Sequence, residues 1–257
     1  MTDSDLKYLL TLPPEEIVKW FYSKGYTFSW NWNEVWQDAH MRSFTVAKVM
    51  NLDILQSLKD EVDKIFSKGI TYEQFVKNLE PELKAIGWWG KVRADQVPGY
   101  DPLSDTPPDK IIELGSPRRL SIIYQTNANV AYSAAHYKFQ TQNAVSRPYW
   151  LYHQIDRKTK RKSHAHFAGK VFMSDDPIWN TIYPPNGWNC GCWVEALTKE
   201  EMQARGLKVS NGNDFIKFAD KNIDPEWQYN PGQSLFSPDL SKYDSDLRAV
   251  YEAYKNV

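Results

Sequence analysis

The chain has 257 residues, and 31 Lys and Arg stand against 32 Asp and Glu, which gives a formal net charge of -1 at pH 7. This length is typical of one or two domains with a real hydrophobic core, and the balanced charge argues against a broad nucleic-acid-binding surface. Two cysteines exclude a disulfide framework, and without a long apolar run or a leader pattern we expect a soluble protein of a reducing compartment.

The first part of the chain, residues 13 to 86, is predicted to be helical. Its clearest amphipathic pattern places apolar residues three and four positions apart, at Val49, Leu52, Leu55, Leu58, Val62, Ile65 and Phe66. Gly69 fits a left-handed helix stop. The segment Thr71–Gln74 has the form of a capping box and starts another helix, which Pro81 is expected to kink or split.

The middle of the chain changes character. Residues 87 to 117 carry several prolines and no periodicity, which indicates a long connection or an extended arm. Ser116 followed by Pro117 is a strong helix start, and the helix that follows is predicted to be long.

After Pro148 the apolar and β-branched or aromatic residues follow the pattern of short strands. Three strands are predicted, at residues 149–155, 170–173 and 192–196. Thr198 is expected to cap a brief helix that stops at Gly206. The remainder is predicted to be surface coil, followed by a last helix from about Asp244 to Tyr254.

These elements predict an α+β fold, in which a helical N-terminal region precedes a long helix packed on a small antiparallel sheet. We divide the chain into a helical N-terminal domain (1–90), a Pro-rich linker or arm (91–117), an α+β module (118–206) and a C-terminal extension (207–257).

Both cysteines, Cys190 and Cys192, lie in one Pro-rich turn, and His164 and Asp156 lie upstream of it. Thiolate sulfur and imidazole nitrogen are the ligands that zinc prefers, so these residues are candidate metal ligands. His153 and His166 are alternatives to Asp156 as the fourth ligand. The competing interpretation is two small buried apolar side chains beside a hydrogen-bonded histidine.

Catalysis is the second interpretation of the same residues. His164 beside Asp156 has the form of a general base oriented by a carboxylate, and either cysteine is a potential nucleophile. No triad or Cys-His signature with recognisable spacing accompanies them. We therefore expect no enzyme, and keep a nuclease-like activity as the alternative.

The densest basic run in the chain follows Asp156 and comprises Arg157, Lys158, Lys160, Arg161 and Lys162. Such a run can neutralise phosphates without sequence preference, and neighbouring aromatic residues can stack on bases. Most charge runs are simply solvated loops. Contact with DNA therefore stays open as an alternative.

Several motifs in order resemble the phage Mu F-like minor head proteins, also called phage head morphogenesis proteins. They include Trp30–Trp32, Gly87–Gly90, Leu114–Leu120, Arg147–Trp150, Gly169–Phe172, Asp175–Trp179 and Pro184–Cys190. Together the matching pieces cover about residues 15 to 232. The chain departs from the family where Gly191 replaces the arginine of Cys-Arg-Cys and where His136 stands in place of another arginine.

The resemblance implies a head-assembly protein that acts in the cytoplasm of the bacterial host and enters the virion. Its implied partners are the phage portal protein and the major capsid or scaffolding protein, with phage DNA as a further candidate and no membrane. The retained Cys190, Cys192, His164 and Asp156 fit a structural role, with zinc as the candidate cofactor.

Overall fold

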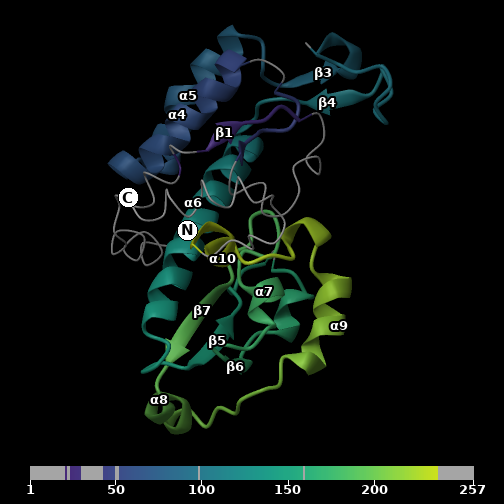
Figure 1. Cartoon of the computed structure of the whole chain (residues 1–257). Coiled ribbons are helices and arrows are strands. Elements are labelled where there is room, and N and C mark those ends of the chain that lie inside the picture. Colours follow the sequence, from purple (N-terminus) through teal and green to yellow (C-terminus); the bar gives the residue numbers. More distant parts are fainter. Residues whose placement is uncertain are drawn as a thin grey trace, which may run out of the picture.

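The long helix α6 (Pro117–Gln142) runs through the centre of the computed structural model, which describes residues 21, 24–29, 43–49, 52–97, 99–158 and 160–236. Figure 1 shows α4, α5 and two small sheets around one half of α6, and a three-stranded sheet with short helices around the other half. Since one continuous set of buried apolar residues lines both halves, α6 joins them through a shared core.

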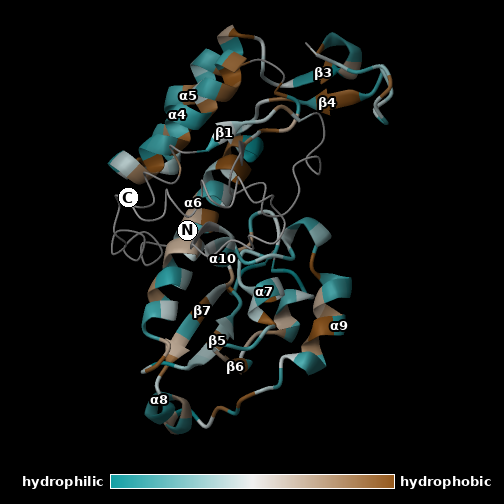
Figure 2. Ribbon diagram, viewed as in Figure 1, coloured by the Kyte–Doolittle hydropathy of each residue, from teal (hydrophilic) through white to brown (hydrophobic). Residues whose placement is uncertain are grey.

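The two helices α4 (Leu52–Lys68) and α5 (Tyr72–Ala85) form as the sequence predicts. Gly69 ends α4 with φ of 62°. Thr71 caps α5, because its hydroxyl accepts a hydrogen bond from the Gln74 backbone while the Gln74 side chain accepts one from the Thr71 backbone. Figure 2 shows hydrophilic and hydrophobic residues alternating along both helices, as expected for helices that bury one face.

Of the two predicted effects of Pro81, a split does not occur, because α5 continues through it to Ala85, and a kink stays a prediction. Proline removes the backbone donor that would reach the carbonyl four residues earlier, at Lys77. Both Pro81 and Lys77 are exposed, so water can solvate the released carbonyl. The helix therefore tolerates the proline on its solvent side.

Two short sheets accompany these helices. β1 (Gly25–Tyr26) pairs in parallel with β2 (Ser43–Phe44), and β3 (Lys91–Arg93) pairs antiparallel with β4 (Ile111–Glu113). The segment predicted as a linker or arm thus contains a β-hairpin. Its hydrophobic strand β4 is visible in Figure 2, and Ile112 is buried in the core.

The helix α6 begins as predicted, with Ser116 accepting a hydrogen bond from the Arg119 backbone at 3.2 Å and Pro117 in the first turn. In one half of α6, the Tyr124 ring packs edge-on against Phe75 at 5.4 Å. In the other half, Tyr137 meets Trp150 of the larger sheet at 5.8 Å. One helix therefore contributes side chains to the packing at both ends.

The larger sheet has the order β6-β5-β7, and both pairings are antiparallel. Its strands are β5 (Tyr149–His153), β6 (Val171–Met173) and β7 (Trp193–Leu197), close to the predicted ranges. The short helix α7 (Trp179–Ile182) lies between β6 and β7, and α8 (Lys199–Ala204) follows β7 with the predicted Thr198 capping box. The α+β class is confirmed, and the proposed domain boundaries stay predictions.

The prediction of coil after Gly206 is wrong within the described residues. The helices α9 (Asn213–Asn222) and α10 (Pro231–Phe236) flank a short 3-10 turn, η3 (Pro225–Trp227). Trp227 and Asn230 are buried, so this segment closes the core instead of following the surface.

The helices expected before Phe21 and from about Asp244 to Tyr254 lie outside the described residues. Among the helices that the structure describes, none has both the length and the apolar character needed to cross a membrane.

Candidate metal centre

The two cysteines and His164 come from separate segments that meet beside β5. His164 opens the 3-10 turn η2 (His164–His166) just before β6, and Cys190 and Cys192 lie on the loop that enters β7. Because β6 and β7 both pair with β5, their preceding loops are brought to the same region. Strand pairing thus explains why residues far apart in sequence converge.

The convergence is close. The His164 Nδ1 atom lies 3.6 Å from the Cys190 Sγ atom and 3.5 Å from the Cys192 Sγ atom. The three possible ligand atoms lie within 4.8 Å of one another. His164 and Cys190 are buried, Cys192 is half-buried, and both cysteines are free thiols. The structure therefore brings together three of the four predicted ligands.

The electrostatics of the thiol pair favour one thiolate. A hydrogen bond with Cys192, assisted by His164 and the Asn186 backbone, holds the pKa of Cys190 well below its usual range despite burial. The pKa of Cys192 is raised by its hydrogen bond with Cys190 and by burial, while the Tyr152 hydroxyl and the Ile155 backbone act in the opposite direction. Metal binding requires both thiols to be deprotonated, which would remove the Cys190–Cys192 hydrogen bond and leave the contacts from Asn186, Ile155 and the Tyr152 hydroxyl to orient the sulfurs.

Asp156 does not join this cluster, which corrects its prediction as the fourth ligand. Its side chain is 92% exposed and pairs with the Lys160 ammonium at 2.7 Å. The loop turns this carboxylate to solvent, where hydration and the neighbouring lysine stabilise its charge. The same geometry removes it as an orienting partner for His164 in a catalytic pair.

The two alternative histidines also have other contacts. The His153 Nε2 atom lies 2.9 Å from a Glu195 carboxylate oxygen, and its ring stacks on Trp193 at 4.0 Å. The His166 ring stacks on Phe218 of α9 at 3.9 Å. Within the described ranges, the ligand cluster is therefore limited to His164, Cys190 and Cys192.

The basic run is not a uniform cationic surface. Arg157 donates to the Asn189 carbonyl, and the Arg161 Nη2 atom donates to the Trp188 carbonyl at 3.0 Å. Both guanidinium groups are thereby committed to the cysteine loop. Lys158, Lys160 and Lys162 are exposed, and Lys160 is paired with Asp156. The two arginines thus also anchor the loop, and nucleic-acid contact by these five side chains stays a prediction.

Arg161 also explains a glycine of the loop. Gly187 has φ of 154°, and a Cβ atom there would lie 2.9 Å from the centre of the Arg161 guanidinium. A side chain at this position would displace the arginine or strain the backbone. The close approach therefore favours glycine in the Pro-Pro-Asn-Gly turn.

Further anchors were not predicted as site residues. The Asn129 side chain of α6 donates to the Cys190 carbonyl at 2.8 Å, and the Asn186 side chain donates to the buried Tyr152 hydroxyl at 2.9 Å. The α6 hydroxyl of Ser133 donates to the Pro184 carbonyl. In the sequence, Asn129 and Ser133 stand out only as polar residues among the apolar residues of a long helix. That pattern does not reveal which loop they bind.

The residues of this arrangement lie in a region that the chain shares with a known protein family. The family model described as "Phage Mu protein F like protein" matches residues 56–195, which run from α4 to β7 and include all three clustered ligands. The chain belongs to this family of phage Mu F-like proteins.

Two curated proteins are similar to most of the chain. It is 39% identical over 261 aligned residues to "Putative capsid assembly protein F" of Escherichia phage Mu, covering 91% of this chain and 58% of that protein. It is 35% identical to "Mu-like prophage FluMu F protein" of Haemophilus influenzae, covering 83% of this chain and 55% of that protein. The chain thus spans somewhat more than half the length of these relatives. No solved structure matches it.

Proposed function

We propose that this chain is a phage head morphogenesis protein, which acts in capsid assembly and becomes a minor component of the virion. The observation that carries the proposal is the 39% identity over 91% of the chain to a protein named for capsid assembly. The matched region includes the anchored cysteine loop. The protein therefore acts as a structural and interaction component and performs no catalytic turnover.

The arrangement around His164 supports this choice over an enzyme. Its Nδ1 atom faces the two sulfur atoms, and Asp156 faces solvent instead of orienting the ring. A nuclease-like mechanism through this pair lacks the carboxylate that such a base requires. We expect purified protein to leave DNA and RNA intact with Mg²⁺, Mn²⁺ or Zn²⁺. Cleavage that disappears in His164→Ala would instead identify an enzyme.

The proposed partners are the phage portal protein and the major capsid or scaffolding protein, which the chain meets in the host cytoplasm during assembly. Tagged protein co-expressed with each candidate should retain its partner through size-exclusion chromatography. Co-expression of the partners with an unrelated tagged protein of similar size provides the control. If neither protein is retained, and phage lacking this gene form heads at normal yield, the proposed function is wrong.

We also propose Zn²⁺ as the ion of the candidate centre. Two sulfur ligands and one imidazole nitrogen suit zinc, and the described residues leave the fourth position to water or to a group outside the described ranges. When bound, the ion would supply folding free energy by cross-linking η2 to the cysteine loop.

Elemental analysis of the purified chain tests this assignment. We expect about one zinc per chain, the usual content of a single structural site. The combined substitutions Cys190→Ser and Cys192→Ser should abolish binding, whereas Asp156→Asn should keep it. A metal-free protein whose melting temperature is unchanged by added zinc would overturn the proposal.

A further inference from the structure

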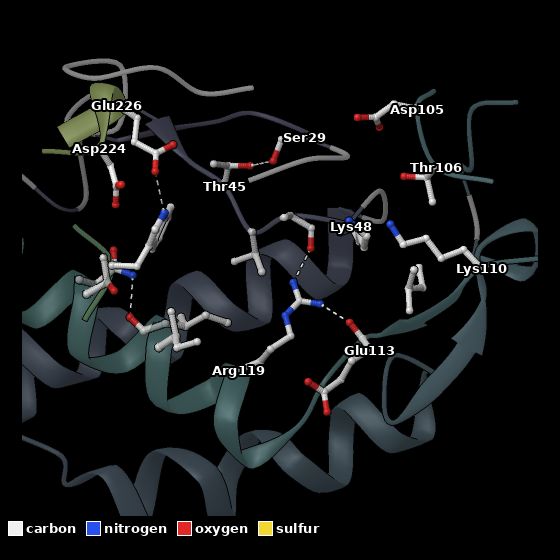
Figure 3. A pocket seen from close by; sticks show the side chains of 18 of the residues that line it. Ser29, Thr45, Lys48, Asp105, Thr106, Lys110, Glu113, Arg119, Asp224 and Glu226 are labelled. Atoms are coloured by element: carbon white, nitrogen blue, oxygen red, sulfur yellow. Dashed lines mark hydrogen bonds between the residues drawn. The ribbon is translucent and has the colours of Figure 1, made fainter. Parts of the chain in front are cut away.

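A cavity of about 800 Å³ lies between α6, the β3–β4 hairpin and the turn that contains Asp224 and Glu226, and it borders the cysteine loop at Trp188. Figure 3 shows Asp224 and Glu226 on one side of this cavity and Lys48 and Lys110 on the other. Its walls also carry Ile122 and Ile123 of α6. A cavity of this size, in which charged and polar groups stand beside apolar wall surface, is large enough for a small-molecule ligand.

Glu226 is the unusual group in this cavity. Glu226 is only 3% exposed. One of its carboxylate oxygens accepts a hydrogen bond from the Trp188 indole at 3.1 Å. The other oxygen, Oε2, is buried and makes no hydrogen bond of good geometry, although the nearby Trp227 side chain also acts to lower the pKa of this carboxyl. No cation of the described residues forms an ion pair with it.

A buried carboxylate without a cation is costly, since burial penalises its charge. Accordingly, burial raises the pKa of Glu226 to about 7. The cavity contains one guanidinium group, on Arg119, but it donates to the carbonyls of Glu113, Leu114 and Ala47. This arginine is therefore committed elsewhere, and the acidic side of the cavity is left without an internal counterion.

The surroundings of Glu226 match an organic cation. Asp224 supplies a second carboxylate, and the Trp188 indole lines the same side of the cavity. Aromatic faces attract ammonium and guanidinium groups, so carboxylates beside an indole form a typical cation site. Thr126 adds a buried hydroxyl that has no hydrogen-bond partner. Ile122 and Ile123 provide an apolar surface for an alkyl chain.

We propose that this cavity binds an organic cation, an alkylammonium or a guanidinium group on an alkyl chain. The charged group meets Glu226 and Asp224 beside Trp188, and the alkyl chain lies along Ile122 and Ile123. The cation comes either from a free polyamine-like molecule or from a Lys or Arg side chain of a protein partner. This site shares Trp188 with the cysteine loop, but its lining does not include His164, Cys190 or Cys192.

Calorimetric titration of the full chain with agmatine and n-butylammonium tests the site, with n-butanol as the neutral control. Both cations should bind, and the alcohol should not. Glu226→Gln keeps an oxygen for the Trp188 hydrogen bond but removes the charge, so cation affinity should fall about tenfold or more. Asp109→Asn, an exposed acid outside the cavity, should bind like the unmodified protein.

Equal binding of the cations and the alcohol, or unchanged affinity in Glu226→Gln, would overturn the proposal. If Glu226→Gln does not fold, Asp224→Asn gives the same test, because it removes the second carboxylate of the site. Unchanged cation affinity in that variant would also overturn it. Absence of binding by both cations in the folded, unmodified protein would do so directly.

Competition distinguishes the two sources of the cation. This competition experiment rests on the proposed function, since it uses portal or capsid protein that the chain retains. If a partner side chain occupies the cavity, saturating agmatine and Glu226→Gln should both reduce retention. If a free small cation is the ligand, retention stays unchanged while agmatine still binds. If the chain retains neither partner, the proposed function is contradicted. If agmatine does not bind, the proposed cation site is contradicted.

Discussion

His164 and Asp156 lie in the same connection between β5 and β6 but have opposite roles at the cysteines. His164 is buried with Nδ1 toward both sulfurs, and Asp156 is exposed and paired with Lys160. A buried side chain that contacts two thiols contributes packing, and with the proposed zinc it would also contribute metal ligation. An exposed ion pair contributes little, because water screens it. Substituting each residue therefore tests whether this site is a structural centre, which needs His164 alone, or a catalytic pair, which needs both side chains.

His164→Ala should lower the free energy of unfolding by about 2–4 kcal/mol, because it removes a buried side chain and a proposed metal ligand. Zinc content should fall in the same variant. Asp156→Ala is the control and should change stability by less than about 0.5 kcal/mol. Denaturant unfolding with elemental analysis measures both quantities. Equal losses in the two variants would show that the carboxylate belongs to the centre.

Arg161 and Lys162 offer a second comparison at this scale. Arg161→Ala should destabilise the protein by about 1.5–3 kcal/mol, since a charged hydrogen bond to the Trp188 carbonyl is lost. Lys162→Ala removes an exposed side chain and should stay within about 0.5 kcal/mol. Thermal unfolding measures the difference. If the two variants are equally stable and both bind DNA more weakly with a smaller salt slope, the run contacts DNA instead.

At the scale of elements, α5 keeps its length despite an internal proline. Pro81→Ala should restore a backbone donor for the Lys77 carbonyl and remove the steric conflict between the proline ring and that carbonyl. We expect a gain of about 1–3 kcal/mol in the free energy of unfolding, reduced by the greater freedom of the unfolded chain. Lys77→Ala is the exposed control and should have a small effect. A less stable Pro81→Ala protein would mean that the proline stabilises the folded state.

Local signals predicted those elements whose ends are set by local chemistry. Thr71, Ser116 and Thr198 cap the helices at which the sequence placed them. The β3–β4 hairpin was missed because its strands are short and far apart, and their pairing depends on packing. The helix α9 was missed although Phe215 and Phe218 mark one of its faces. That face is stabilised by contact with His166 and Phe167, which a local pattern does not show.

The candidate centre was predictable to a similar extent. Ligand chemistry alone singled out His164, Cys190 and Cys192, because few residue types bind soft metals. Solvent exposure excluded Asp156, and exposure of one carboxylate cannot be derived from spacing. The contributions of Asn129 and Tyr152 depend on how α6 and β5 meet the loop. Such contacts between distant segments require the three-dimensional structure.

For the whole molecule, Glu226 links stability to pH. Its pKa is raised from 4.5 to about 7, so the folded state binds the proton more tightly than the unfolded state. The Glu226 contribution is therefore fully present below about pH 4.5 and is lost as pH rises through 7.

Glu226→Gln should remove this loss and make the protein more stable than the parent at pH 8, on the order of 2 kcal/mol, with little difference at pH 4.5. Urea unfolding at the two pH values, without added cations, measures it. Asp109→Asn should leave the pH profile unchanged. The same stability gain at both pH values would show that charge burial is not the cause.

The helix α6 has a mechanical consequence. Its 26 residues correspond to a rod of about 39 Å, and no loop interrupts it between the two groups of elements. Bending one end against the other would require breaking consecutive backbone hydrogen bonds. A force applied at the hairpin end should therefore be transmitted to the larger sheet instead of being absorbed by a hinge.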